Sequence, residues 1–150
     1  MRVFIVYCHP SKDSFTKNMC AAFIKGITDS GNEYIMSDLY EMGFDPVMKE
    51  KEYLRDANYR DTPAVADDVR KEHEKINSAD AIAFIYPVFW TEAPAMLVGW
   101  FDRVWSYGFA YGNTPFQRSC PCRNLRCLRS HDCGYAHGRN ARLKHTDTRH

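Results

Sequence analysis

Residues 81–105 read AIAFIYPVFWTEAPAMLVGWFDRVW, and they contain the pattern of a strand, a loop and a helix. Residues 81–86 form a short continuous apolar run, which is typical of a strand that is buried on both faces of a parallel sheet. Pro87 ends this run, and Pro94 stands where the first turn of a helix tolerates proline. The helix predicted after Pro94 is apolar on almost every side, so we expect a core or a second subunit to cover it.

The same alternation of strand and helix occurs upstream. Residues 3–7 and 33–37 are predicted strands, and a helical pattern that opens at Ser14 lies between them. A second, charged helix is predicted from Pro63 to about Ala79. The residues expected to face inward are Phe15, Met19, Ala22, Phe23 and Ile27 in the first helix and Val65, Val69, Ile76 and Ala79 in the second. We therefore expect an α/β fold in which helices cover both faces of a parallel sheet and strand 3–7 lies in the middle.

Residues 41–62 are polar and irregular, and we expect a loop there. Met1 leads directly into a strand and no apolar run approaches the ~20 residues that span a bilayer, so we expect a cytoplasmic protein without a secretory leader or membrane span. Cys8 and Cys20 are then expected to be small reduced core residues.

Two loops follow strands at the edge where open α/β sheets bind ligands. The loop after residues 3–7 offers hydroxyls and a free helix N-terminus, which favours a phosphate, although Ser14 would equally serve as a simple N-cap. The loop at residues 87–94 carries Phe89 and Trp90, which could stack on a flat ring or could be ordinary core aromatics. Taken one at a time, both loops favour the interpretation without a ligand, in which Ser14 is only an N-cap and Phe89 and Trp90 are core aromatics.

Taken together, the motifs resemble the NAD(P)H:quinone oxidoreductase (DT-diaphorase) family of flavodoxin-like flavoproteins. The resemblance rests on His-Pro-x-x-x-Ser-Phe at residues 9–15 and on Ser-Asp-Leu-Tyr-x-Met-x-Phe-x-Pro at residues 37–46. Its most specific part is the block at residues 86–104, and Gly-Phe-Ala-Tyr at residues 108–111 completes it. All four motifs lie within residues 1–112.

The resemblance implies a flavodoxin-like three-layer sandwich with strand order 2-1-3-4-5, a homodimer and two-electron reduction of quinones by NAD(P)H. The flavin would be FAD, with FMN as the alternative. The cofactor-binding residues carried over by motif are His9, Ser14, Phe15, Pro87, Val88, Phe89, Trp90 and Asp102. Trp90 and, across the dimer, Tyr111 would wall the site where nicotinamide and quinone alternate. A non-catalytic regulatory subunit of the potassium-efflux ancillary type is the alternative function.

Residues 113–150 differ from the rest of the chain. Residues 1–112 contain 12 Lys and Arg against 17 Asp and Glu, a net −5, whereas residues 113–150 contain 8 against 2, a net +6. No apolar periodicity is evident from residue 119 onward, so we expect a disordered or non-native tail, a sheet that stops after the third strand and its helix, and impaired turnover. A reading-frame slip, or a divergent splice or gene end, would explain this composition.

Two functional interpretations of the tail rank lower. The side chains that could bind zinc are Cys120, Cys122, Cys127, His131 and Cys133. Their spacing is not that of paired C-x₂-C knuckles, so we predict no metal site. The basic charge could attract nucleic acid, but no aromatic residues are interleaved with it to stack on bases, and we predict no nucleic-acid partner.

Overall fold

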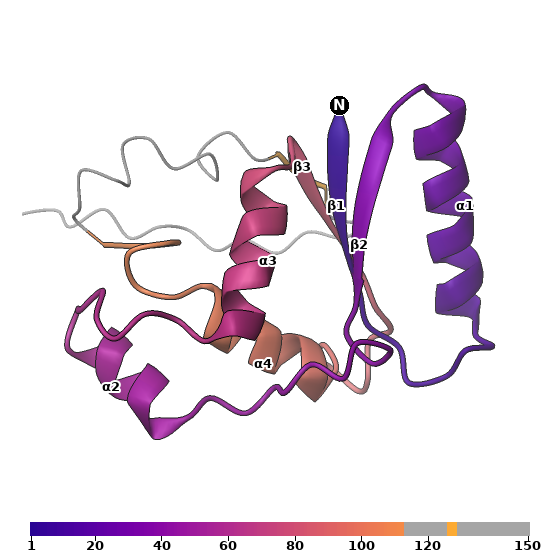
Figure 1. Cartoon of the computed structure of the whole chain (residues 1–150). Coiled ribbons are helices and arrows are strands. Elements are labelled where there is room, and N and C mark those ends of the chain that lie inside the picture. Colours follow the sequence, from indigo (N-terminus) through magenta and orange to yellow (C-terminus); the bar gives the residue numbers. More distant parts are fainter. Residues whose placement is uncertain (113–125, 129–150) are drawn as a thin grey trace, which may run out of the picture.

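The computed structural model of the chain describes residues 1–112 and the backbone of residues 126–128. The strands are β1 (Arg2–Tyr7), β2 (Glu33–Asp38), β3 (Ala81–Ile85) and β4 (Arg126–Leu128), and the helices are α1 (Phe15–Asp29), α2 (Glu50–Ala57), α3 (Asp67–Asn77) and α4 (Ala95–Val104). All pairings in the sheet are parallel, and the strand order is β2-β1-β3-β4. α1 covers one face, and α3 and α4 cover the other, so the expected three layers are confirmed (Figure 1).

β1 lies in the middle because its side chains are apolar on both faces. Phe4 and Val6 pack into the core beneath α3 and α4, and Val3, Ile5 and Tyr7 pack beneath α1. All five are at most 1% exposed. Burying side chains of this size stabilises a fold by about 1.5–3 kcal/mol each, so a strand without a polar face adds to stability when both of its faces are covered.

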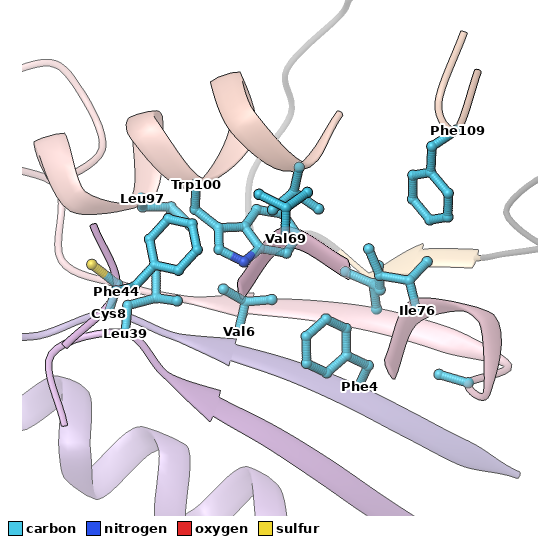
Figure 2. Close-up of a cluster of buried hydrophobic side chains, with 13 residues drawn as sticks. Phe4, Val6, Cys8, Leu39, Phe44, Val69, Ile76, Leu97, Trp100 and Phe109 are labelled. Atoms are coloured by element: carbon cyan, nitrogen blue, oxygen red, sulfur yellow. The ribbon is translucent and has the colours of Figure 1, made fainter. Parts of the chain in front are cut away.

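Trp100 organises the larger core. It projects from α4 onto the sheet above Val6, as Figure 2 shows, and it is completely buried. Its ring lies 6.4 Å from that of Phe4 and 5.8 Å, edge to face, from that of Phe84. The helix that looked apolar all round is therefore covered largely within the chain, at Leu97, Trp100 and Val104.

The irregular loop expected at residues 41–62 is wrong, because α2 occupies residues 50–57 of it. α2 has no apolar stripe: its buried residue is Arg55, whose Nε donates to the Pro63 carbonyl oxygen at 3.0 Å. The second predicted helix also begins later than expected, at Asp67, although Val69, Ile76 and Ala79 are buried as predicted.

The inward face predicted for α1 is partly wrong. Phe15 is 79% exposed and Met19 is 49% exposed, whereas Cys20 and Ile27 are buried against the sheet. The first turn of α1 thus leaves two large apolar side chains in solvent at the start of the helix.

A short fourth strand corrects the expectation that the sheet stops at β3. Residues 126–128 pair in parallel with Ala81–Ala83. The candidate zinc ligands other than Cys127 and the expected disorder of the tail fall outside the residues that the structure describes, and of Cys127 only the backbone is described.

Candidate functional site

The carboxyl ends of three neighbouring strands meet at one edge of the sheet. Asp38, Tyr7 and Ile85 form its last paired row. Beyond this row, the Cys8 amide donates to the Ile85 carbonyl and the Leu39 amide to the Tyr7 carbonyl, both at 3.0 Å. The loops after β1, β2 and β3 are therefore held side by side, where doubly wound sheets bind their ligands.

The loop after β1 ends in a helix start that is able to bind an anion. Ser14 is the N-cap of α1, and its Oγ accepts a hydrogen bond from the Lys17 amide at 3.1 Å. Within the described part of the chain, the amides of Phe15 and Thr16 have no acceptor. Two free amides and the positive end of the helix dipole together favour a phosphate at this point.

His9 is fixed within the same loop. Its Nδ1 lies 3.0 Å from both the amide nitrogen and the carbonyl oxygen of Ser11. The Ser11 hydroxyl bonds onward to the backbone of Asp13. These local bonds set the orientation of the imidazole and leave its Nε2 without a partner among the described residues.

The loop after β3 forms a tight hairpin that presents its aromatic residues to solvent. The backbones of Phe89 and Glu92 bond to each other in both directions at 3.0 Å, and Trp90, at the tip, has a φ of 56°. A bulky side chain rarely adopts this left-handed region, and such strain tends to occur at functional sites. Trp90 is fully exposed (101%) and Phe89 is 45% exposed, so the alternative that both are core aromatics is wrong.

This loop also offers backbone donors. Val88 is 66% exposed and Pro87 is partly buried at the base of the loop. The amides of Val88 and Trp90 have no acceptor within residues 1–112. A flat heterocycle laid against residues 87–90 would find apolar surface and hydrogen-bond donors together.

Two predicted site residues are not brought to this edge within one chain. Asp102 is exposed in the last turn of α4, and the described contacts give it no partner. Tyr111 follows α4, whereas Trp90 precedes it, and the Tyr111 ring packs edge to face on Tyr107 at 5.7 Å. Burial, followed by the nearby Asp56 carboxylate, raises the pKa of the Tyr111 hydroxyl.

Cys8 lies directly beneath the site and takes no part in its chemistry. It is completely buried, and burial raises the pKa of its thiol to about 11. A thiol in that state is a poor nucleophile, so the expectation that Cys8 is a small core residue is confirmed.

Sequence reasoning missed two side chains at the same edge. Tyr40 and Met42 follow β2 and are 39% and 42% exposed. Their position in the sequence could have identified them, because a residue directly after a buried parallel strand lies at the ligand-binding edge of the sheet whatever its type. The candidate site thus draws on three loops, one after each strand.

The sheet is open and parallel, a helix start able to bind an anion follows its first strand, and a solvent-exposed aromatic hairpin follows its third. These features define the class of doubly wound α/β proteins, which bind ligands at the carboxyl edge of the sheet. Residues 1–130 match the family described as having a flavodoxin-like fold, and the chain belongs to that family. The match runs past residue 112, so the similarity extends further along the chain than the four motifs indicated.

Several relatives are named as oxidoreductases. The chain is 32% identical over 142 residues to NAD(P)H dehydrogenase [quinone] 1 of Cavia porcellus, covering 86% of this chain and 52% of that protein. It is 38% identical over 112 residues to an uncharacterized NAD(P)H oxidoreductase of Haemophilus influenzae, covering 74% and 54%. The solved NAD(P)H:quinone oxidoreductase from Methanothermobacter marburgensis superposes with a TM-score of 0.72 at 46% identity, covering 74% and 56%. The chain spans about half the length of these relatives.

Proposed function

We propose that the chain binds a flavin at the carboxyl edge of its sheet and belongs to an NAD(P)H-dependent quinone reductase. The observation that carries the proposal is the loop after β3. It holds Trp90 fully in solvent with a positive φ, beside free amides and at the same edge as the anion-binding start of α1. Exposing so large an aromatic stabilises nothing in the chain itself, which favours a role in binding.

The residues present suit a flavin. His9, Ser14 and the first amides of α1 would hold the phosphate, with Phe15 beside the ribityl chain. Pro87, Val88, Phe89 and Trp90 would lie along the ring system. Bound there, the flavin would supply the chemistry for two-electron transfer between NAD(P)H and a quinone, and these residues would hold and orient it. The names of the relatives support NAD(P)H as donor and quinone as acceptor.

The choice between FAD and FMN is part of the proposal. We favour FAD and keep FMN as the alternative. Titration with each flavin in parallel decides the point, because the adenylate of FAD adds a second group whose binding FMN cannot reproduce.

A homodimer is also part of the proposal, on a changed basis. Four apolar residues in and after α4 were expected to drive association: Trp100 and Val104 are completely buried within the chain, whereas Phe101 and Trp105 are only partly buried. The remaining argument is Tyr111, which lies at the far end of α4 from Trp90 and can wall the site only from a second subunit. Asp102, exposed on α4, stays a predicted cofactor contact without support from the described contacts.

Impaired turnover stays a prediction that rests on the atypical composition of residues 113–150. The relatives reported above are oxidoreductases and lend no support to the regulatory-subunit alternative. Within the described residues no helix is long and apolar enough to cross a membrane. A cytoplasmic location stays a prediction.

Flavin titration of the purified chain tests the proposal, with quenching of flavin fluorescence as the readout. Trp90→Ala should weaken binding by about tenfold or more, since base-type stacking on an aromatic contributes roughly 1–3 kcal/mol. Tyr34→Leu, an exposed aromatic of β2 near the amino edge, is the matched control and should leave binding unchanged. Failure of the unaltered chain to bind either flavin would refute the proposal.

A further inference from the structure

A fully buried carboxylate lies beneath the candidate site. Glu72, in the middle of α3, has no exposed surface. It is surrounded by three donors from three elements: the Ser37 hydroxyl of β2 at 2.8 Å, the Trp100 indole Nε1 of α4 at 2.9 Å and the Lys75 ammonium of α3 at 2.7 Å. Lys75 Nζ also donates to Ser37 Oγ at 2.7 Å.

Both carboxylate oxygens of Glu72 and the Ser37 hydroxyl have hydrogen-bond partners. Glu72 Oε1 accepts from Lys75, while Oε2 accepts from Ser37 and Trp100. The Ser37 hydroxyl accepts one bond and donates one. A buried carboxylate is tolerated when it is paired and hydrogen-bonded in this way, and loss of one partner leaves the others unsatisfied.

The position of the cluster is what links it to the site. Ser37, Val6 and Phe84 form one row across the sheet, directly below the last row at the carboxyl edge. Trp100 contacts Phe84 at one end of this row and, through Glu72, bonds to Ser37 at the other. The Glu72 carboxylate therefore joins β2 to α4 across β1, just beneath the loop that carries the anion-binding helix start.

We propose that Glu72 is a positioning residue for the candidate site. By joining the end of β2 to α4, it sets the separation of the loop after β2 from the hairpin that precedes α4. Tyr40 and Met42 stand on one of these loops and Trp90 on the other, so this separation fixes how far apart the side chains lie that would meet a ligand. The identity of the ligand rests on the proposed function, whereas the positioning of the loops by Glu72 does not.

Amide hydrogen exchange of the full chain without flavin tests the positioning directly. Glu72→Gln keeps the size of the side chain but turns an amide NH₂ or a neutral oxygen toward the Lys75 ammonium. Exchange in residues 39–44 and 86–94 should accelerate by about tenfold or more. Ile27→Ala, in the core beneath α1 at the end of that helix farthest from the site, is the destabilised control and should leave both loops unchanged. Equal acceleration in the two variants, or none in Glu72→Gln, would overturn the proposal.

A coupled pair of variants separates positioning from a general loss of stability. Lys75→Met removes the ammonium that the Gln amide cannot satisfy, so Glu72→Gln with Lys75→Met should return loop exchange toward that of the unaltered chain. If Glu72→Gln does not fold, Ser37→Ala decides instead, and it should accelerate exchange in residues 39–44 by about threefold. Additive effects in the double variant, or an unchanged loop in Ser37→Ala, would contradict the proposal.

Flavin affinity supplies the second readout. Glu72→Gln should weaken binding by about fivefold or more at a temperature where it is fully folded, and Ile27→Ala should not. If the unaltered chain binds no flavin, the proposed function fails while the exchange data still decide the role of Glu72. If flavin binds equally to all variants while exchange changes, the separation of the loops does not govern binding, and the claim that Glu72 acts on the candidate site is refuted.

Discussion

α1 and α4 both begin at the carboxyl edge of the sheet, yet their first turns are built in opposite ways. α1 starts at Ser14 with free amides and with Phe15 and Met19 exposed. α4 starts at the buried Pro94 and turns Leu97 and Trp100 completely into the core. The two helix starts therefore differ in the side chains that they present at this edge of the sheet: α1 leaves large apolar groups in solvent, whereas α4 buries its own.

The largest expected effect is a difference in stability between truncating a buried aromatic of α4 and truncating an exposed aromatic of α1. Trp100→Ala should lower the free energy of unfolding by about 3–5 kcal/mol, because it opens a large cavity and leaves Glu72 short of a donor. Phe15→Ala, an aromatic truncation at the start of α1, should change it by only about 0.5 kcal/mol. Urea unfolding measures both, and similar losses would break the comparison.

The same substitution in each helix should act with opposite sign. A Cβ on Gly99 of α4 would collide with the backbone oxygen and Cβ of Pro46, whereas nothing lies within 4 Å of a Cβ on Gly26 of α1. Gly99→Ala should therefore destabilise by about 1–3 kcal/mol through overpacking. Gly26→Ala should stabilise by about 0.5–1 kcal/mol, as alanine does within a helix. Thermal unfolding of the two variants side by side is the measurement, and a shared sign would contradict the packing described.

The cap of α1 should show a smaller effect with two readouts. Ser14→Ala removes the acceptor of the Lys17 amide and should cost about 1 kcal/mol of stability. It should also weaken flavin binding if the phosphate lies at this helix start. Asn18→Ala, at an exposed position one turn on, controls for a general loss of helix, and an identical flavin affinity in Ser14→Ala would place the phosphate elsewhere.

The smallest expected effect is the pH dependence at the far end of α4. His73 Nε2 lies 2.8 Å from the Val104 carbonyl oxygen, and its ring stacks on Phe109 at 3.6 Å. Burial lowers the pKa of His73 below 6.5, so the unfolded chain binds the proton more readily. The contribution of this residue is complete above pH 6.5 and is lost as the pH falls through 6.5 toward the folded pKa. His73→Gln should flatten the stability profile over that window, and an unchanged slope between pH 8 and pH 5 would refute the assignment.

β1 and β3 were predictable because each is a short run of residues that is apolar on both faces and bounded by polar residues or proline. The site was predictable to the level of its loops, because the carboxyl ends of parallel strands must meet. α2 was missed because its apolar residues, Tyr53 and Leu54, are adjacent and exposed while Arg55 is buried. A helix whose buried side chain is an arginine has no apolar periodicity from which it could be predicted.

Two further misses have the same origin in long-range contacts. Phe15 and Met19 fit the helical spacing of a buried face, but the sheet ends beneath them. Glu72 is indistinguishable in sequence from the exposed Glu74, because its partners Ser37 and Trp100 come from elements 35 and 28 residues away. The buried position of Glu72 could not be predicted without these contacts.

The pairing of β1 with β3 sets a waiting time during synthesis. Val3 lies beside Ala81, so the first strand cannot complete its ladder until the third has been made. At about 5–20 residues per second, translation of the intervening chain takes roughly 4–16 s, far longer than collapse of a short segment. During that interval one edge of β1 has no strand beside it, so the nascent chain carries an apolar strand with unpaired backbone groups.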